Sequence, residues 1–489
     1  MMRWVYKSFQ IICCWILLQS SALAESAVLE VDGLMAANQW REAAKIVFLE
    51  AKRINPHDSR IAIAQAKAGL IDDALESVNE LYPDARSSAL LSIVRNSPIL
   101  SFQKEQQLLQ QALYWGRRNS DKPYTDGFKS EELASIALYY SAKGMEDKAK
   151  LTFAEAINDA QSGLMADDSS GFRRITDLLR KAPVKQVKSW MLSDIYNALI
   201  HDTDSLNRAF GCIDMVAVSA RLKNRGLMNK FTDCANSAIR QIEHARLKNR
   251  AIEALGLSQI EMKGFVLPPS TSPILEAIRH VRSGQIEKSY EMISGFGENL
   301  YVSHKSYAYG LIFDDAIKRG DLHTAQYFAQ RGDGDTQISI WQRLAEKQFE
   351  LKSQSAAVKS YTKALTAAKT LNVATDVNLF NIHSLVRLGQ SLIQHGMKEE
   401  GYKTLTIARS SIDKISPMNM EDRVLASIAV SDAFWHNGWK RGANDLIRQA
   451  YFDAHSYDTT QPFGEMRKLD LLVSIGESIG GYTTLKSND

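Results

Sequence analysis

Gly476–Gly480 reads GESIG and fits G-x-S-x-G, the pattern of a nucleophile elbow in which a serine lies on a sharp turn between a strand and a helix. That chemistry also needs an acid and then a histidine after the serine. Only nine residues follow Gly480, and none of them is His. We therefore expect 466–481 to form a last, capping helix that ends at Gly480-Gly481, and we expect no catalytic serine there.

Other short motifs also fail as sites. RGD occurs at Arg319–Asp321 and Arg331–Asp333, but the first copy is predicted to be a turn whose Asp321 caps the next helix, and the second a loop. DGD at 333–335 lacks the further spaced carboxylates of a calcium loop. The chain contains no H-E-x-x-H, no C-x-x-C and no glycine-rich phosphate loop. These patterns predict a protein that is not an enzyme and that has no metal or cofactor.

Two cysteines, Cys212 and Cys234, remain if residues 1–24 are removed. They fall on either side of a turn near Lys223–Gly226, at depths that differ by about four residues, or ~6 Å along a helix. A disulfide needs Cα atoms within about 7 Å. The pair could therefore be bridged, or it could be two buried thiols that pack as small hydrophobic groups.

The hexapeptide ARLKNR occurs twice, at Ala220–Arg225 and Ala245–Arg250. Eight Lys or Arg lie between 220 and 250 against only two acids, Asp233 and Glu243. We predict that each copy closes a helix. The charges then either neutralise helix C-termini or form a patch for an anionic partner, such as an acidic protein, a phospholipid headgroup or a cell-wall polymer. The candidate residues of this basic patch are Arg221, Lys223, Arg225, Arg246, Lys248 and Arg250.

The elements that would position these residues follow a repeated frame of small side chains around turns. Gly69, Gly144, Gly320 and Gly438 are each followed five residues later by Ala, and Asn38 and Lys352 keep the same register without Gly. Seven residues before the turns lie further small residues: Ala62, Ala137, Ala277, Ala345, Gly389 and Ser431. Two antiparallel helices approach closely where side chains are small, and the turn favours Gly because a left-handed residue ends the first helix.

This frame resembles the tetratricopeptide repeat, a helix–turn–helix unit of 34 residues. The best-matching unit is LAEKQFELKSQSAAVKSYTKALTAAK, through Ala345, Ala357, Tyr361, Ala364 and Leu365. The turns are more widely spaced here, for example 36 residues from Gly284 to Gly320 and 42 from Gly396 to Gly438, and the early Trp and Leu of the family are mostly absent. The resemblance implies an all-α solenoid of about ten to twelve antiparallel helical hairpins.

The resemblance also implies a concave groove lined by the first helix of each hairpin, which in this family binds peptides or proteins. Carried over position by position, it places these residues on the inner face: Lys67, Asp314, Lys318, Glu346, Gln390, Gln394, Asp432, Trp435 and His436. Their mixture of charges and amides favours a polar peptide or protein segment as the partner.

One segment interrupts the pattern. Phe265–Leu275 reads FVLPPSTSPIL, and Pro268-Pro269 cannot continue a helix. We predict an irregular N-terminal array over 25–264, a Pro/Ser-rich break at 265–273 and a more regular array with its capping helix over 274–489. The alternative is a long loop inside one continuous solenoid.

Residues 1–24 predict export. Arg3 and Lys7 precede the apolar run IICCWILL, and Ala22-Leu23-Ala24 fits a cleavage site, which is the order of a secretory signal peptide. Nothing later in the chain offers 18 continuous apolar residues, so no integral membrane segment is expected after the signal is removed. The rest of the chain is close to neutral, which predicts no nucleic-acid partner.

The sequence therefore predicts a non-enzymatic interaction scaffold or adaptor of the bacterial cell envelope, periplasmic or secreted, that binds a protein or peptide. An anionic envelope component is a partner only under the alternative in which the cations between 220 and 250 form a patch instead of neutralising helix ends. The alternative is an exported enzyme with an (α/α) toroid that acts on polysaccharides through paired carboxylates and aromatic platforms.

Overall fold

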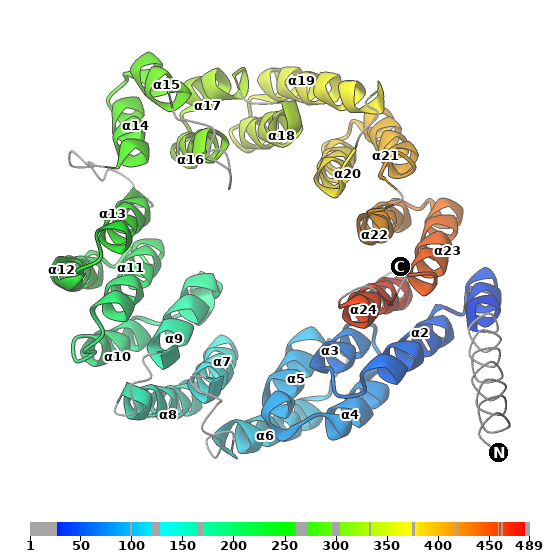
Figure 1. Cartoon of the computed structure of the whole chain (residues 1–489), viewed down its shortest axis with the longest axis horizontal. Coiled ribbons are helices and arrows are strands. Elements are labelled where there is room, and N and C mark those ends of the chain that lie inside the picture. The colour runs from blue at the N-terminus through cyan, green and yellow to red at the C-terminus, as the bar shows by residue number, and fades with distance from the viewer. Residues whose placement is uncertain are drawn as a thin grey trace, which may run out of the picture. The chain divides into compact units, whose positions relative to one another are not determined.

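The computed structural model describes residues 27–97, 100–118, 128–164, 170–260, 272–295, 304–331, 334–373, 377–416, 418–457, 459–460 and 463–484. All regular structure in these ranges is helical (Figure 1). The helices α2 to α24 pack as consecutive hairpins, in the number that ten to twelve hairpins require. The predicted all-α repeat architecture is confirmed. The proposed signal peptide, 1–24, lies outside the described residues.

The contacts divide the chain into two compact units. Unit 1 combines Met1–Glu105 with Val358–Asp489, and unit 2 is Gln106–Ala357. These limits differ from the predicted arrays 25–264 and 274–489. Most of the predicted break at 265–273 lies outside the described residues, so a domain boundary at that point stays a prediction.

The turn frame read from the sequence is present in the backbone. The predicted turn glycines, including Gly144 and Gly438, have positive φ, and so do the non-glycine turn residues Asn38 and Lys352. The small residues of the frame are buried between the paired helices, as shown by Ala149 and Ala443, which have no exposed surface. The frame therefore marks where each first helix ends and where its partner packs against it.

Unit 2 is a contiguous run of hairpins. Its helices are α7 (Phe128–Ala142), α8 (Glu146–Leu164), α9 (Ser170–Lys181), α10 (Ser189–Leu199), α11 (Ser205–Arg221), α12 (Arg225–Gln241), α13 (Ala245–Ile260), α14 (Pro273–Arg282), α15 (Ile286–Ser294), α16 (His304–Arg319), α17 (Leu322–Ala329) and α18 (Gly334–Glu350), with a short 3-10 helix η2 (Val184–Gln186). Helices α6 (Phe102–Arg118) and α19 (Gln354–Val373) contain the points at which the two units divide.

A disulfide, two hydrophobic clusters and a close helix contact hold neighbouring helices of unit 2 together. Cys212 on α11 and Cys234 on α12 form a disulfide with a Cα–Cα distance of 6.1 Å, which resolves the alternatives left open by the sequence. One hydrophobic cluster spans α7 to α13, and a second spans α14 to α17. A Cβ placed on Gly256 would lie 2.4 Å from Leu275, so α13 packs closely on α14 despite the prolines between them.

Unit 1 is built from both ends of the chain. From the N-terminal part come α2 (Trp40–Ile54), α3 (Ser59–Lys67), α4 (Ile71–Glu80) and α5 (Pro83–Asn96). From the C-terminal part come α20 (Leu379–Gln394), α21 (Lys398–Ile412), α22 (Met420–His436), α23 (Lys440–His455) and α24 (Gly464–Thr484). Helices α20 and α21 form one hairpin and α22 and α23 the next, and α3 pairs with α4.

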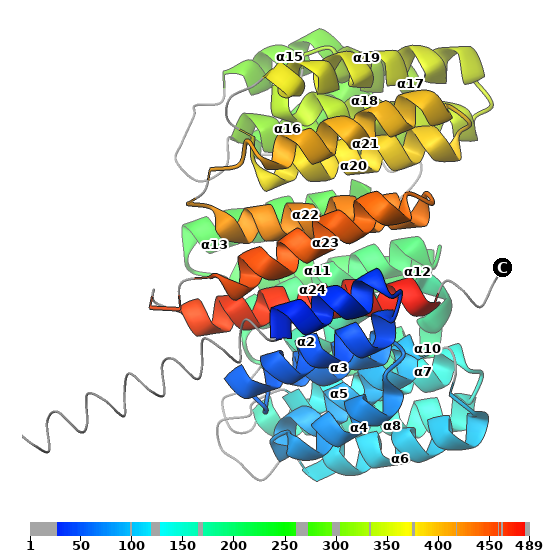
Figure 2. The same ribbon diagram turned by 90° about the vertical axis from the view of Figure 1, so that its right-hand side faces the viewer.

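The last helix, α24, pairs with α2 rather than ending the array (Figure 2). Tyr482 packs edge-on against Trp40 near the start of α2, and Gly476 approaches Phe48 further along it, so the two helices run antiparallel as in a hairpin. Helix α24 also contacts α22 and α3, which are first helices of their hairpins. Thus α24 is the first helix of a composite repeat whose second helix, α2, lies at the other end of the chain.

Close packing at this joint corrects the prediction of a capping helix that stops at Gly480-Gly481. Both glycines lie inside α24, which continues to Thr484. A Cβ on Gly480 would lie 2.0 Å from the Cβ of Ala68, so Gly480 lets the helix touch the end of α3. Helix α24 is the last described helix, as predicted. A capping helix would expose one face to solvent, but in α24 the helices α2 and α3 cover that face.

Polar contacts reinforce the same joint. The Tyr451 hydroxyl donates to Glu50 at 2.6 Å, and Nε2 of His455 lies 3.5 Å from the other Glu50 oxygen. Burial opposes the charge on Glu50, but the bonds from His455 and Tyr451 outweigh burial and lower its pKa. Arg448 donates to Asp32 at 2.6 Å, which ties α23 to residues that precede α2.

Candidate functional site

A pocket of about 560 Å³ lies in unit 1 and is lined by the three successive first helices α20, α22 and α24. Its apolar part consists of Leu425, Ile428 and Ala429 on α22. Its polar part is formed by His383, Asp432, His436, Ser474, Glu477, Ser478 and Tyr482. The pocket therefore falls on the face where the groove was predicted, and Asp432 and His436 of the predicted groove line it.

The carboxylate of Asp432 is held in place by two hydrogen bonds within this pocket. The hydroxyls of Ser478 and Tyr482 both donate to its Oδ1, the latter at 3.1 Å. Burial raises the pKa of Asp432, against the opposing effect of these two hydrogen bonds, and the nearby Glu477 raises it further. Both hydroxyls bind Oδ1, and no described residue donates to Oδ2, so Oδ2 can accept a hydrogen bond from a bound group.

Two histidines stand at the edges of the pocket. His436 is exposed, and its Nδ1 donates to the backbone oxygen of Asp432 at 2.6 Å, which fixes the ring over the end of α22. Burial, together with the charge of Arg387, lowers the pKa of His383 on α20. A neutral imidazole at this edge can donate or accept a hydrogen bond.

Lys67 and Glu477 close the side of the pocket next to α3. The Lys67 ammonium lies 2.8 Å from the Glu477 carboxylate, and both side chains are about two-fifths exposed. Lys67 was predicted to lie on the inner face, and the structure places it beside the pocket. An exposed pair of this kind contributes little stability, so it can exchange for a partner's charge at low cost.

The remaining predicted groove residues divide between the units. Gln390 and Gln394 are exposed on α20 in unit 1. Asp314 and Lys318 lie on α16 and Glu346 on α18, all in unit 2, where Asp314 forms an ion pair with Arg343 at 2.6 Å. Whether the nine residues act as one groove stays a prediction.

Trp435 is not available to a partner. Its side chain is 6% exposed and stacks on Tyr482, with ring centroids 4.2 Å apart. It also meets Trp40 edge-on at 5.0 Å. Because α24 and α2 cover it, Trp435 belongs to the core of the composite repeat and not to the surface of the groove.

The first copy of ARLKNR is mainly structural. Arg221 is the last residue of α11, and its guanidinium donates to the backbone oxygens of Leu179 and Ala182 at 3.1 and 3.4 Å. Lys223 lies in the turn with positive φ, and Arg225 begins α12. The prediction that this copy closes a helix is confirmed, and Arg221 satisfies carbonyls at the end of another helix, α9.

The second copy lies elsewhere in its helix than predicted. Helix α12 ends at Gln241, and Ala245–Arg250 form the first turns of α13. The prediction that this copy closes a helix is therefore wrong. Arg246 and Arg250 are exposed there, while Lys248 is half-buried and donates to the backbone oxygen of Arg240 at 3.3 Å. The argument that cations neutralise a helix C-terminus does not apply to them.

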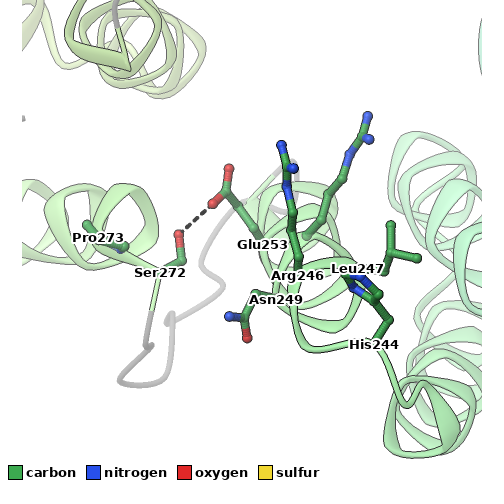
Figure 3. A pocket seen from close by; sticks show the side chains of 8 residues that line it. His244, Arg246, Leu247, Asn249, Glu253, Ser272 and Pro273 are labelled. Atoms are coloured by element: carbon green, nitrogen blue, oxygen red, sulfur yellow. Dashed lines mark hydrogen bonds between the residues drawn. The ribbon is translucent and has the colours of Figure 1, made fainter. Parts of the chain in front are cut away.

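These arginines line a second pocket, of about 880 Å³, within unit 2 (Figure 3). His244, Arg246, Leu247, Asn249, Arg250 and Glu253 come from α13 and the residue before it, and Ser272 and Pro273 from the start of α14. The Ser272 hydroxyl donates to Glu253 at 2.9 Å and joins the two walls. The basic patch is thus divided: Arg246 and Arg250 line a cavity, and Arg221 is occupied by the fold.

The motifs that resembled chemistry have structural explanations. Ser478 of GESIG lies within α24, where a helix replaces the strand-to-helix turn of a nucleophile elbow. Asp321 of the first RGD accepts from the backbone N of Thr324 and caps α17, as predicted. The second RGD falls partly outside the described residues.

Among the described residues, no group of three or more His, Cys, Asp or Glu side chains could bind a metal ion. Among the helices described, none has both the length and the apolar character needed to cross a membrane.

Sequence reasoning missed five polar residues of the unit 1 pocket: His383, Ser474, Glu477, Ser478 and Tyr482. Four of them lie on α24, which was taken for a cap without a partner. A usable signal was present, because Gly476 and Gly480 are one helical turn apart and place a small-residue stripe on one face. Such a stripe indicates close approach of another helix, although it does not say which one.

No protein-family model matches the chain, and no curated protein matches it. Solved structures similar to it include a circular tandem repeat protein with novel repeat topology, with a TM-score of 0.22 and 11% identity over 96% of this chain and 92% of that chain. A homology model of the full-length AP-3 complex has a TM-score of 0.29 and 11% identity over 92% of each chain. The APC/C hetero-tetramer Cut9-Hcn1 has a TM-score of 0.21 and 12% identity over 89% of this chain and 88% of that chain. At these TM-scores, none of the three establishes a shared fold for the whole chain.

Proposed function

We propose that this protein is a non-enzymatic scaffold, exported to the bacterial cell envelope, that binds a polar peptide or protein segment on the inner face of unit 1. The observation that supports binding most directly is the pocket formed by α20, α22 and α24, which are consecutive first helices of the array. Helical repeats generally recognise partners on this face.

The chemistry of the pocket favours a segment with an apolar side chain next to a hydrogen-bond donor or cation. Leu425 and Ile428 offer the apolar contact, and Asp432 and Glu477 offer acceptors at one edge. A donor from the partner that reached Asp432 would satisfy a carboxylate whose burial disfavours its charge. Binding would therefore compensate a cost that the free protein already carries.

Export is supported by two observations. Residues 1–24 have the charged, apolar and small-residue order of a signal peptide. The Cys212–Cys234 disulfide is typical of a protein that folds in an oxidising compartment. Fractionation of cells that express the tagged protein tests this part: we expect a shortened chain in the envelope, and a full-length cytoplasmic chain would contradict it.

Site-specific crosslinking tests the binding face. A photo-crosslinking amino acid at position 436 lies at the pocket, whereas one at Phe452, which is 56% exposed on the second helix α23, is the control. We expect position 436 to crosslink one defined partner and position 452 not to. Adding Ala429→Arg, which fills the pocket, should remove the crosslink. Equal crosslinking at both positions, or persistence with Ala429→Arg, would contradict the proposal.

One observation favours the alternative of a polysaccharide-acting enzyme. Asp432, with its raised pKa, and Glu477 line one pocket, and glycosidases use two carboxylates in different environments. Assays of the purified protein on envelope polysaccharides decide between the two. Hydrolysis that is lost with both Asp432→Asn and Glu477→Gln would replace the scaffold by an enzyme.

A further inference from the structure

The two copies of ARLKNR place the same six residues in two environments, and only one environment explains its cations. Arg221 in the first copy donates to two backbone oxygens. In the part of the chain that the structure describes, Arg246 and Arg250 of the second copy have neither a carboxylate nor a carbonyl partner. Among the described residues, no contact therefore accounts for the second pair.

Their position costs stability in two ways. Arg246 lies in the first turn of α13, where the positive end of the helix dipole repels a cation. The two arginines are also four residues apart, so the two like charges lie on the same face of the helix and repel one another. The described part of the fold shows no gain from these two guanidinium groups, whereas a bound anion would relieve both repulsions.

The residues around Arg246 and Arg250 form a pocket that could hold such an anion. His244, Arg246, Asn249 and Arg250 line the pocket between α13 and the start of α14. Figure 3 shows the Arg246 side chain extending to the same side of α13 as Glu253. Glu253 is the opposing carboxylate in the lining, and one of its oxygens is already bound to Ser272. Among the described residues of the lining, two arginines thus face one glutamate, before any contribution from His244.

We propose that this pocket binds a phosphate group. Guanidinium groups donate two parallel hydrogen bonds to phosphate oxygens, and two such groups one helical turn apart can hold a phosphate from two sides. The phosphate is either that of a soluble compound or that of an anionic lipid headgroup. This inference is independent of the proposed peptide-binding function, since it concerns the other unit and other residues.

The first ARLKNR copy supplies the matched control. The variant Arg246→Ala/Arg250→Ala and the control Lys223→Ala/Arg225→Ala each remove two exposed cations from the same motif, and only the first pair lines the pocket. All four side chains are exposed, so both variants are expected to fold. Calorimetric titration with inorganic phosphate tests the soluble source, and flotation with phosphatidylglycerol-containing vesicles against phosphatidylcholine vesicles tests the lipid source.

We expect the protein to bind in at least one arm, and binding there to weaken roughly 10-fold or more in Arg246→Ala/Arg250→Ala but not in the control. Glu253→Gln, which removes the opposing charge, should strengthen binding. Absence of binding in both arms, or equal weakening by the two double variants, would overturn the proposal, because the second result indicates a diffuse effect of charge.

Discussion

Units 1 and 2 are both arrays of helical hairpins, yet different contacts hold them together. Unit 2 is one continuous stretch, and a disulfide between α11 and α12 links neighbours 22 residues apart. Unit 1 joins the two ends of the chain through α24 and α2, whose contacts, such as that of Lys67 with Glu477, span about 410 residues. The same repeat is therefore stabilised locally in one unit and by long-range packing in the other.

The difference has a consequence for folding. Contacts between neighbouring helices form early because they close short loops, whereas contacts between distant segments form after a larger entropic cost. We expect unit 2 to assemble hairpin by hairpin. Unit 1 is complete only when α24 reaches α2, and its pocket, which α24 helps to line, is complete only at the same time.

The pocket of unit 1 and the pocket of unit 2 differ in whether their charged side chains already have partners. In unit 1 the charged groups already have partners: Asp432 binds two hydroxyls, and Glu477 binds Lys67. In unit 2, Arg246 and Arg250 have no such partner among the described residues. The polar groups of the unit 1 pocket are already held in place, so a peptide can bind by exchanging hydrogen bonds with them. The arginines of the unit 2 pocket favour an anion, because an anion supplies the opposite charge.

The largest effect is expected where α24 meets α3. Gly480→Ala places a Cβ 2.0 Å from that of Ala68, so it should lower the free energy of unfolding of unit 1 by roughly 2–3 kcal/mol. The adjacent Gly481→Ala meets nothing within 4 Å and should instead stabilise by roughly 0.5–1 kcal/mol. Urea unfolding with hydrogen-exchange readout on α2 and α11 measures both. Equal effects of the two variants would break the claim of close packing.

An effect of comparable size is expected from the disulfide of unit 2. Cys212→Ser/Cys234→Ser should lower the stability of the α11–α12 hairpin by about 2–4 kcal/mol, because a closed loop of this length restricts the unfolded chain. Exchange in α2 and α24 should not change. Adding reductant to the wild type should reproduce the effect and should do nothing further to the double variant. A loss of protection in unit 1 as well would contradict the independence of the two units.

A smaller effect separates the two hexapeptides. Arg221→Ala leaves the carbonyls of Leu179 in α9 and of Ala182 just after it without their donor and should cost about 1–2 kcal/mol. Arg246→Ala removes no such bond and should be neutral or slightly stabilising in the absence of a ligand. Thermal unfolding in phosphate-free buffer makes the comparison. Similar losses would show that the second copy is also structural.

The smallest effect is a pH dependence. Burial raises the folded-state pKa of Asp432, so the native state keeps this proton to higher pH than the unfolded chain does. The contribution of Asp432 to stability therefore falls as pH rises from the ordinary carboxyl pKa through the raised one. Asp432→Asn should remove this fall and flatten the curve of unit 1. The opposite result would be a wild-type stability that rises with pH through the same window while that of Asp432→Asn does not. It would contradict a raised pKa for Asp432.

The local part of the fold could be predicted from the sequence because it rests on single residues with strong preferences. Gly69, Gly144, Gly284, Gly320, Gly396 and Gly438 all have positive φ, as their positions before the second helices predicted. Asn38 and Lys352, chosen by register alone, adopt the same conformation. A left-handed turn and a small residue at a fixed offset are local features, so a single sequence can reveal them.

The long-range part could not be predicted in the same way. Nothing in the residues of α24 names α2 as its partner, since Gly476 and Gly480 would suit any helix that approaches closely. The start of α13 was missed for another reason: Ile242-Glu243-His244 contains none of the Ser, Thr, Asp or Asn residues that usually cap a helix N-terminus. The ARLKNR copy at 245 was therefore read as the end of one helix instead of the beginning of the next.

The most direct test of the account is hydrogen exchange on a chain truncated after Tyr457, which removes α24. If α24 is the first helix of the repeat that α2 completes, the amides of α2 and α3 should lose most of their protection, because Trp40, Phe48 and Ala68 lose the helix that covers them. Protection of α11 and α12 in unit 2 should be unchanged. Full protection of α2 and α3 in the truncated chain would contradict the composite repeat, and with it the pocket that supports the proposed function.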